Sequence, residues 1–260
     1  MAVVKPFSLR LFQPSEFDGP TNMAIDQALL ESVASGAPGC LRFYTWKRPT
    51  LSLGYFQASA GRQDHAHSRN IDLVRRSSGG GAIVHHRELT YSLVVPQPRQ
   101  QTATRTDLYE IMHGTVTDML HSDGISAVRW ASVSRPSVVP PPADGSTPPP
   151  FLCFQRRTDE DLLVAGYKVL GSAQRRSGDA VLQHGSLLLS VSPYAPELPG
   201  IAELSGARLT ATEVAARWCT TLAENRHWRF QEAELPASVV DRAAIIRAQR
   251  FDEPSWTHRR

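Results

Sequence analysis

Apolar residues recur along the chain with a spacing of three to four in some segments and of two in others. The longer spacing is typical of a helix with one buried side. It predicts four helices, over residues 22–35, 106–122, 212–225 and 237–249. In the first of these, Asn22 is placed to cap the opening turn, because a side-chain oxygen there accepts a hydrogen bond from an unpaired backbone N–H.

Strands are predicted by short runs of aliphatic and aromatic residues that end at glycine, proline or polar residues. These runs cover residues 41–46, 50–56, 71–76, 82–86, 89–96 and 180–190. Residues 161–174 predict a hairpin that turns at Ala165 and Gly166. Because strands and helices mix without a regular strand–helix–strand alternation, the pattern favours an α/β (α+β) fold with a central mixed β-sheet and flanking helices.

Prolines concentrate in one segment, residues 134–150, which holds seven of the 19 in the chain. Proline cannot donate to a sheet ladder, so this segment is excluded from a sheet interior. Strand-like segments with related chemistry lie on both sides of it. We therefore expect one domain over residues 1–260 with a proline-rich insertion at 134–150, in preference to two domains joined by a linker.

Composition narrows the class of protein. Of the 260 residues, 41% are hydrophobic and 20% are charged, with a formal net charge of +3, which fits a folded globular chain and argues against a nucleic-acid-binding surface. No apolar run approaches the roughly 18 residues of a membrane span, and the first residues lack the features of a signal peptide. Three cysteines form no disulfide framework. We expect a cytoplasmic protein that binds neither nucleic acid nor membranes.

A glycine-rich segment follows one predicted strand, in the sequence RRSSGGGAIVHH of residues 75–86. Gly79, Gly80 and Gly81 let the backbone approach a ligand closely, and their N–H groups can surround an anion or a carbonyl oxygen. Arg75 and Arg76 add forked donors that suit phosphate or carboxylate. The alternative is that the glycines only make a tight connection between adjacent strands.

Cys153, in FLCFQRR, is a candidate nucleophile. Lys168 lies on a predicted strand that can run beside it, and a nearby ammonium stabilises the thiolate that attacks carbonyl carbon. The alternative is a small buried hydrophobic residue, which is our interpretation of Cys40 and Cys219. In LQHGSLLLS, His184 and Gly185 interrupt an apolar strand, and the histidine is either structural or catalytic. No CxxC or HxxxH spacing occurs, so no metal site is predicted.

Several motifs together resemble the lipoate/octanoate branch of the biotin and lipoate protein ligase family. They are NMAIDQALL, LRFYTWKRPTLSLGYFQ, RRSSGGGAIVHHRELTYSLVVP, GYKVLGSAQRR, LQHGSLLL and the C-terminal DEPSWTHRR, in that order. The resemblance implies a class II synthetase/biotin-ligase-like catalytic core. It also implies that the arginine–glycine motif and the motif lysine contact the acyl group. Those positions and their neighbours in this chain are Arg75, Arg76, Gly79, Gly80, Gly81, His85, Lys168, Gly171, Ser172, His184 and Gly185.

Within that family, a Cys-Phe pair at 153–154 followed by GYKVLGSAQ resembles the ligase-like octanoyltransferases. This implies transfer of an octanoyl group from octanoyl-acyl-carrier protein to a lysine of a lipoyl domain, such as the glycine-cleavage H protein. Cys153 would carry the acyl group as a thioester, with Lys168 beside it and no cofactor. One alternative is an ATP- and magnesium-dependent lipoate–protein ligase. Others are an amidotransferase between lipoyl domains, a cysteine hydrolase with His85 or His184 as base, and a non-catalytic binding protein.

Overall fold

The computed structural model describes residues 7–98, 105–133 and 150–260. In this part of the chain, eight strands form one mixed sheet in the order β11-β1-β2-β6-β10-β9-β8-β7. β1 runs parallel to β2 and β11, and the other neighbours are antiparallel. The strands are β1 (Ser8–Phe17), β2 (Cys40–Trp46), β6 (Glu88–Pro96), β7 (Ala127–Arg129), β8 (Leu162–Val164), β9 (Tyr167–Ser177), β10 (Ala180–Leu188) and β11 (Arg229–Ala233).

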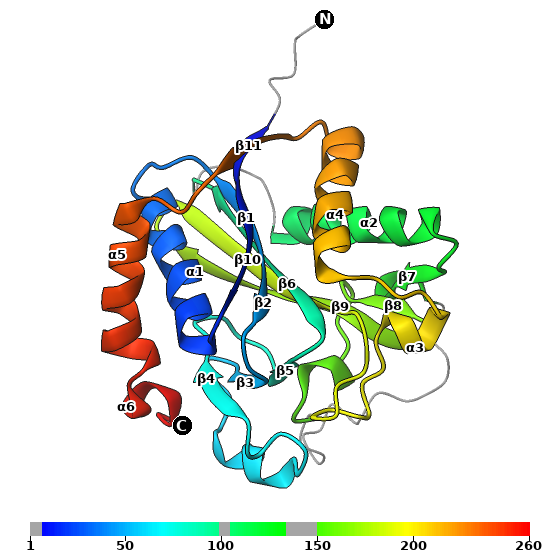
Figure 1. Cartoon of the computed structure of the whole chain (residues 1–260), viewed down its shortest axis with the longest axis horizontal. Helices are drawn as coiled ribbons and strands as arrows, with labels where there is room; N and C mark the ends of the chain where they lie inside the picture. The colour runs from blue at the N-terminus through cyan, green and yellow to red at the C-terminus, as the bar shows by residue number, and fades with distance from the viewer. Residues whose placement is uncertain (1–6, 99–104, 134–149) are drawn as a thin grey trace, which may run out of the picture.

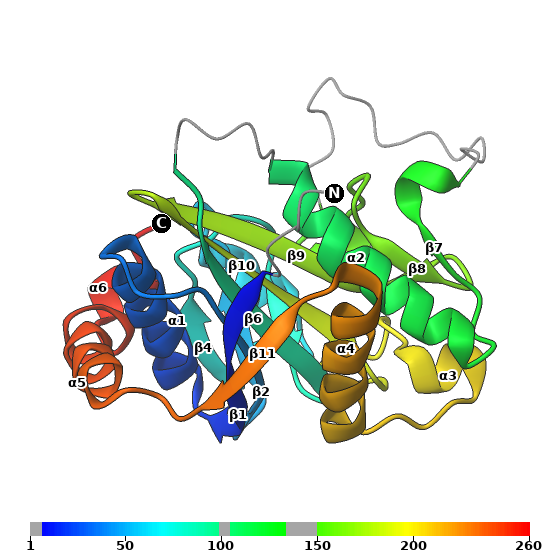
Figure 2. The same ribbon diagram turned by 90° about the horizontal axis from the view of Figure 1, so that it is seen from above.

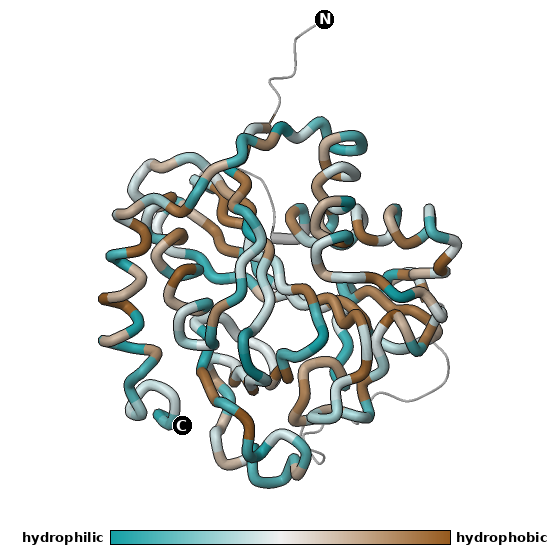
Figure 3. The backbone as a smooth tube through the Cα atoms, in the orientation of Figure 1, coloured by the Kyte–Doolittle hydropathy of each residue, from teal (hydrophilic) through white to brown (hydrophobic). Residues whose placement is uncertain are grey.

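Helices cover both faces of this sheet (Figures 1 and 2). One face packs against α1 (Gly19–Ala34) and α5 (Ala237–Ile246), and the other packs against α2 (Arg105–Ser122), α3 (Ile201–Ser205) and α4 (Ala211–Arg226). Alternate residues of a strand point to opposite faces. In β2, Leu41 and Phe43 therefore join the core under α2 and α4, whereas Cys40 and Tyr44 join the core under α1. Along α5, hydrophobic and hydrophilic segments alternate in Figure 3, as expected for a helix with one buried side. The predicted mixed sheet with flanking helices is confirmed.

A second, small sheet positions the glycine-rich segment. Its strands are β3 (Thr50–Leu53), β4 (Asp72–Arg75) and β5 (Ile83–His85), in the order β4-β3-β5. A separate apolar cluster, which includes Leu51, Leu53 and Leu152, lies beneath it. β4 leads into residues 76–82, and β5 leads out of them. Gly79 and Gly80 line the same pocket as Met23 of α1 and Tyr44 of β2, so the glycines lie next to the α1 face of the large sheet.

Helix α1 begins three residues earlier than the apolar spacing predicts. Asp18 is its N-cap and accepts a hydrogen bond from the backbone N–H of Thr21 at 2.9 Å, and a proline lies in the first turn. The expectation that Asn22 caps the helix is therefore wrong. Asn22 is buried, and its side-chain amide donates to the carbonyls of Phe17 and Thr45.

Three strands at or near the sheet edges, β1, β7 and β11, were not predicted. β1 contains Pro14, and its register against β2 shifts between Phe12 and Ser15. An irregularity of this kind is where a strand tolerates proline. The predicted hairpin is present between β8 and β9, with Ala165 and Gly166 at φ +47° and +81°. The insertion at 134–150 falls almost wholly outside the described residues.

The C-terminal segment folds back toward the small sheet. After α5 comes a π-helical turn, Arg247–Phe251, and then α6 (Pro254–Thr257). The indole N–H of Trp256 donates to the carbonyl of Arg75 at 2.9 Å. Within the described ranges, no helix has the length and apolar character to cross a bilayer.

Candidate active site

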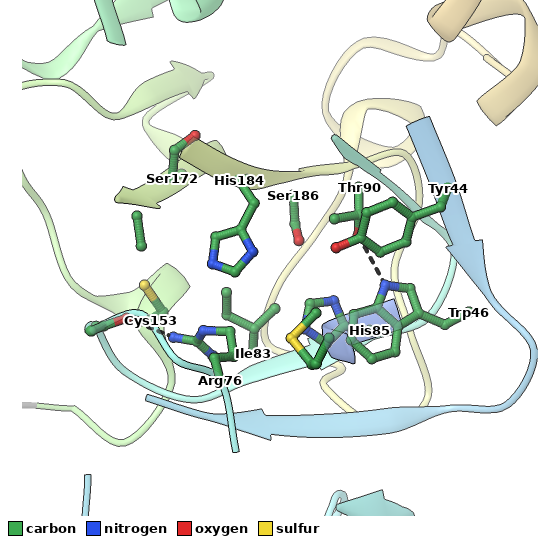
Figure 4. Close-up of a pocket in the computed structure, with 16 residues that line it drawn as sticks. Tyr44, Trp46, Arg76, Ile83, His85, Thr90, Cys153, Ser172, His184 and Ser186 are labelled. Carbon is green, nitrogen blue, oxygen red and sulfur yellow. Dashed lines mark hydrogen bonds between the residues drawn. The ribbon is translucent and has the colours of Figure 1, made fainter. Parts of the chain in front are cut away.

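A pocket lies between the α1 face of the large sheet and the glycine-rich segment. Figure 4 shows Cys153 and Arg76 at one end, Tyr44, Trp46 and Thr90 at the other, and His184 and Ile83 between them. The lining comprises Met23, Tyr44, Trp46, Arg76, Gly79, Gly80, Ile83, His85, Thr90, Cys153, Gly171, Ser172, Ala173, His184, Gly185 and Ser186. Nine of these are sequence-predicted site residues: Arg76, Gly79, Gly80, His85, Cys153, Gly171, Ser172, His184 and Gly185.

Cys153 is half-buried and begins a short 3₁₀ turn, Cys153–Gln155. Its backbone N–H donates to the carbonyl of Ala82 at 2.7 Å, and the N–H of Ala82 donates to the carbonyl of Phe151 at 3.0 Å. These two bonds tie the cysteine to the end of the glycine-rich segment. A Cβ added at Gly80 would lie 3.8 Å from Sγ. Gly80 is exposed and has φ +97°, so a glycine suits this part of the entrance.

Lys168 of β9 lies beside this thiol, and its side chain is buried. Nζ is 3.9 Å from Cys153 Sγ and 2.9 Å from Asp161 Oδ2. The carboxylate also accepts a hydrogen bond from the backbone N–H of Thr158 at 2.7 Å. The ammonium is therefore shared between a fixed carboxylate and the sulfur. The structure brings together the two residues expected to be catalytic, and it adds Asp161, which the sequence analysis missed.

Arg76 anchors the glycine-rich segment from the inside. Its Nη2 donates to the carbonyls of Gly79 and Gly81, both at 2.9 Å, and its Nη1 donates to the carbonyl and the hydroxyl of Ser52. Burial lowers the pKa of Arg76 to about 10, although the nearby Cys153 acts in the opposite sense. The guanidinium fixes two of the three glycines and places a positive charge close to the sulfur. Gly81 itself lies behind the pocket wall, against the guanidinium of Arg156.

Arg75 was expected at the pocket, but its side chain points elsewhere. Nε donates to the carbonyl of Thr257 at 2.9 Å, and Nη1 donates to the carbonyls of Gly54 and Gln57 at 2.8 and 2.6 Å. Adjacent residues of a strand face opposite ways, so only one of the two arginines can point into the pocket. Arg75 holds the C-terminal segment against the small sheet.

His85 forms part of the pocket wall as a neutral imidazole. Nδ1 lies 2.5 Å from the carboxylate of Glu88, Nε2 lies 2.7 Å from the hydroxyl of Ser52, and the ring stacks on Trp46 with 3.7 Å between centroids. Burial lowers its pKa below 6.5 despite the attraction of Glu88. Because Ser52 already accepts from Arg76, its own hydroxyl proton is free to donate to Nε2. Both ring nitrogens are thus occupied.

Both ring nitrogens of His184, on β10, also have hydrogen-bond partners. Its Nδ1 is 3.2 Å from Asp26 Oδ2, and its Nε2 is 2.5 Å from the hydroxyl of Ser78. Burial alone would raise the pKa of Asp26, but the hydrogen bond from His184 and the charge of Arg42 lower it below its ordinary value. The ionised carboxylate accepts a hydrogen bond from Nδ1 of His184 and holds the ring with Nε2 toward Ser78.

The GSAQ sequence of residues 171–174 is explained by a buried hydrogen-bond chain. The hydroxyl of Ser172 lies 2.7 Å from both His113 Nε2 and the hydroxyl of Tyr91, which in turn accepts from Gln183. Gln183 accepts from Gln174 at 2.7 Å. Burial lowers the pKa of His113 to about 4, so it is neutral and can accept from Ser172. This chain joins α2, β6, β9 and β10 behind the pocket wall.

Gly171 and Gly185 stand where neighbouring atoms leave no room for a side chain. A Cβ on Gly171 would lie 2.4 Å from Lys168 Cε and 2.8 Å from Nζ. A Cβ on Gly185 would lie 2.1 Å from the hydroxyl oxygen of Ser172 and 2.7 Å from the carbonyl oxygen of Gly171. All four distances are too short for real Cβ atoms. The glycines therefore let Lys168 and the neighbouring strand reach their positions.

The apolar end of the pocket was not predicted. Tyr44 and Trp46 come from the strand LRFYTW, and the Trp46 indole N–H donates to the hydroxyl of Thr90 at 2.9 Å. Met23 of α1 also contributes. The motifs that contain these residues were recognised, but which strand face they occupy depends on the register between β2 and β6. Over the described ranges, no group of three or more His, Cys, Asp or Glu side chains is arranged to hold a metal ion.

Sequence comparisons identify relatives of this chain. Residues 18–208 match the family described as the lipoyl protein ligase A/B catalytic domain. The octanoyltransferase LipM of Carboxydothermus hydrogenoformans is 38% identical over 188 residues, which cover 70% of this chain and 65% of that protein. The LipM of Kyrpidia tusciae is 29% identical over 286 residues, covering 96% and 98%. The chain thus spans just under two thirds of the length of the first relatives it matches.

Solved structures of lipoate ligases share the fold. A putative lipoate protein ligase from Thermoplasma acidophilum with bound lipoic acid superimposes with a TM-score of 0.75 at 20% identity, covering 97% of this chain and 99% of the other. A lipoate–protein ligase A bound with ATP gives 0.72 at 21% identity, covering 98% and 99%. At these identities the likeness concerns the fold. The family match extends from α1 to just beyond α3 and includes every pocket-lining residue, so this chain belongs to the lipoyl protein ligase A/B catalytic-domain family.

Proposed function

We propose that this protein is an octanoyltransferase, which moves an octanoyl group from octanoyl-acyl-carrier protein to a lysine of a lipoyl-domain protein through an acyl-Cys153 thioester. The observation that carries the proposal is the position of Cys153. Its sulfur lies at the polar end of a largely apolar pocket, 3.9 Å from Lys168 Nζ. The resemblance to octanoyltransferases LipM supports the same reaction.

The first step is a thioester exchange. The Cys153 thiolate attacks the carbonyl carbon of the donor thioester, and a new C–S bond forms while the carbonyl oxygen becomes an oxyanion. Lys168 and backbone N–H groups of the glycine-rich segment are the available donors for that oxygen, and one such donor is commonly worth about 10²- to 10³-fold in rate. Collapse of the intermediate breaks the original C–S bond. The pantetheine sulfur leaves as a thiolate and takes up a proton from solvent.

The second step forms an amide. The neutral amine of the acceptor lysine attacks the carbonyl carbon of acyl-Cys153, and the C–S bond breaks. Cys153 leaves as the thiolate, and the nitrogen loses one proton to a base or to solvent. The first step replaces one thioester by another, and the second replaces a thioester by a more stable amide, so the reaction needs no nucleotide to drive it. We propose that it uses no cofactor.

The pocket supplies a site for the acyl chain. Tyr44 and Trp46 line its far end, and Ile83 continues the apolar lining from there toward the sulfur. Burying seven carbons beyond the carbonyl contributes up to ~6 kcal/mol, at about 0.8 kcal/mol per CH₂. The same burial keeps water away from the thioester carbonyl, which favours transfer to the amine over hydrolysis.

The histidines argue against a cysteine hydrolase. That mechanism needs a histidine within hydrogen-bonding reach of the nucleophile. His85 and His184 both have their two ring nitrogens occupied by other side chains. Among the described residues, the polar side chain that reaches Cys153 Sγ is Lys168. A cysteine paired with an ammonium in this way fits acyl transfer.

The test is intact-protein mass spectrometry after incubation with octanoyl-acyl-carrier protein in the absence of ATP. We expect one octanoyl group on the wild type and on Cys219→Ala, none on Cys153→Ala, and loss of the group when a lipoyl-domain protein is added. An ATP-dependent ligase would give no adduct. Its activity with free lipoate and ATP would survive in Cys153→Ser, and that result would overturn the proposal.

A further inference from the structure

Beside the pocket entrance lies a surface group of two aromatic residues and three arginines: Phe56, Arg175 and Arg260, which are exposed, and Tyr55 and Arg259, which are partly buried. We call it the aromatic–arginine rim. We propose that this rim is the docking surface for the carrier protein that brings the acyl group, and that it binds the anionic face around the donor's phosphodiester-linked arm. This inference rests on the proposed function, because it presumes a protein-bound thioester donor.

The rim is assembled from three distant parts of the sequence. The guanidinium carbon of Arg259 lies 3.7 Å from the ring centroid of Tyr55, and that of Arg175 lies 5.4 Å from the same ring. Arg260 lies 5.4 Å from the ring centroid of Phe56, which packs edge-on against Tyr55. Phe56 is 66% exposed. An aromatic side chain with this exposure among cations is typical of a binding surface.

The electrostatic field at the rim is positive. Hydrogen bonding from Arg259, followed by the charges of Arg259, Arg175 and Arg260, lowers the pKa of the Tyr55 phenol. The charges of Arg259 and Arg260 also add to the effect of burial in lowering the pKa of Arg75. The contacts and these two pKa shifts both indicate that the positive charges of the three arginines add together at the rim.

A short chain of contacts links the rim to the proposed nucleophile. Cys153 Sγ lies against Gly80, which in turn packs closely on Gly54. A Cβ added to Gly54 would lie 1.9 Å from the carbonyl oxygen of Gly80. The next residue, Tyr55, donates its N–H to the carbonyl of Ser78 at 2.8 Å. The rim therefore begins one residue beyond the entrance of the pocket.

Strand β9 provides a second link. Gly171 and Ala173 line the pocket, and Arg175 follows at the same two-residue interval. Side chains at this interval share one face of a strand, about 7 Å apart. Arg175 thus lies on the pocket face of β9, past the end of the cavity. Arg176, the next residue, faces the other way and donates to Gln97.

The positive charge of the rim favours the carrier protein that donates the acyl group over the lipoyl-domain protein that accepts it. A pantetheine arm is joined to its carrier through a phosphodiester, which is negative at all working pH values, and the arginines attract it. The acceptor presents a lysine, whose ammonium the same arginines repel. Attraction between surface charges steers association and weakens with salt over the ~8 Å screening length at physiological ionic strength.

The two neighbouring arginines of β9 offer a matched test, Arg175→Glu against Arg176→Glu. The measurement is the KM of Cys153 acylation for octanoyl-acyl-carrier protein at two salt concentrations. We expect Arg175→Glu to raise this KM about fivefold or more at low salt, with a smaller difference at high salt, and Arg176→Glu to leave it within twofold. With octanoyl-N-acetylcysteamine, a neutral donor without a carrier, Arg175→Glu should match the wild type. Unchanged melting temperatures in both variants exclude misfolding as the cause.

Three results would overturn the inference. Arg175→Glu could leave the carrier-protein KM and its salt dependence unchanged while wild-type Cys153 is still acylated, in which case the rim fails and the proposed function stands. The KM for the lipoyl-domain protein could rise instead, which would assign the rim to the acceptor. Finally, the absence of any acylation of the wild type by the carrier-protein donor would remove the proposed function and the docking surface together.

Discussion

Replacing Gly171 with alanine tests whether the position of Lys168 controls the reaction. The added Cβ would lie 2.4 Å from Lys168 Cε and 2.8 Å from Nζ, whereas ordinary contacts begin near 3.4 Å. The end of the lysine side chain must therefore move by about 1 Å. This displacement changes the distances from Nζ to Asp161 and to the sulfur, which are 2.9 and 3.9 Å. A misplacement of about 1 Å commonly costs on the order of 10²-fold in rate.

The assay is the single-turnover rate of octanoyl-Cys153 formation, followed by acid quench and mass spectrometry. We expect Gly171→Ala to acylate about 100-fold more slowly while its melting temperature changes little, because the atoms that must give way are the far end of a flexible side chain. Gly79→Ala is the matched control. It lies in the same pocket, keeps its backbone N–H, and its Cβ would meet nothing within 4 Å. Gly171→Ala with a wild-type rate would refute the role assigned to the Lys168 ammonium.

Three further predictions concern reactivity and stability. Burial raises the pKa of Cys40 and Cys219 to about 12, so iodoacetamide at pH 8 should modify Cys153 alone in the native protein, and equal labelling of either other thiol would contradict this. Burial lowers the pKa of His113 from 6.5 to about 4, so the unfolded chain binds the extra proton in that range and stability falls as pH decreases. At about 1.4 kcal/mol per pH unit, urea unfolding should show the wild type losing about 3 kcal/mol more than His113→Gln between pH 7 and pH 4, and parallel losses would contradict it. Gly185→Ala places a Cβ 2.7 Å from a backbone carbonyl of the neighbouring strand, which should destabilise the fold by about 3 kcal/mol, and a calorimetric melting temperature close to that of the wild type would refute it.

The sequence by itself determined most of the secondary structure and the family. Four helices and the central strands follow from the spacing of apolar residues, because that spacing reflects which side of each element is buried. The ordered motifs identify the family, and residues 18–208 match it. The edge strand β11 and its neighbour β1 are not predicted because they are more polar and pair with each other across more than 200 residues of sequence.

Only the tertiary structure decided how the site residues are arranged. The sequence alone did not reveal that Arg76 enters the pocket while Arg75 holds the C-terminal segment. Nor did it reveal that Asp161 shares the ammonium of Lys168. Each outcome depends on strand register and on which face a side chain occupies, and a shift of one residue would reverse the face. Periodicity is local and therefore visible in the sequence, whereas these contacts join residues that only the folded chain brings together.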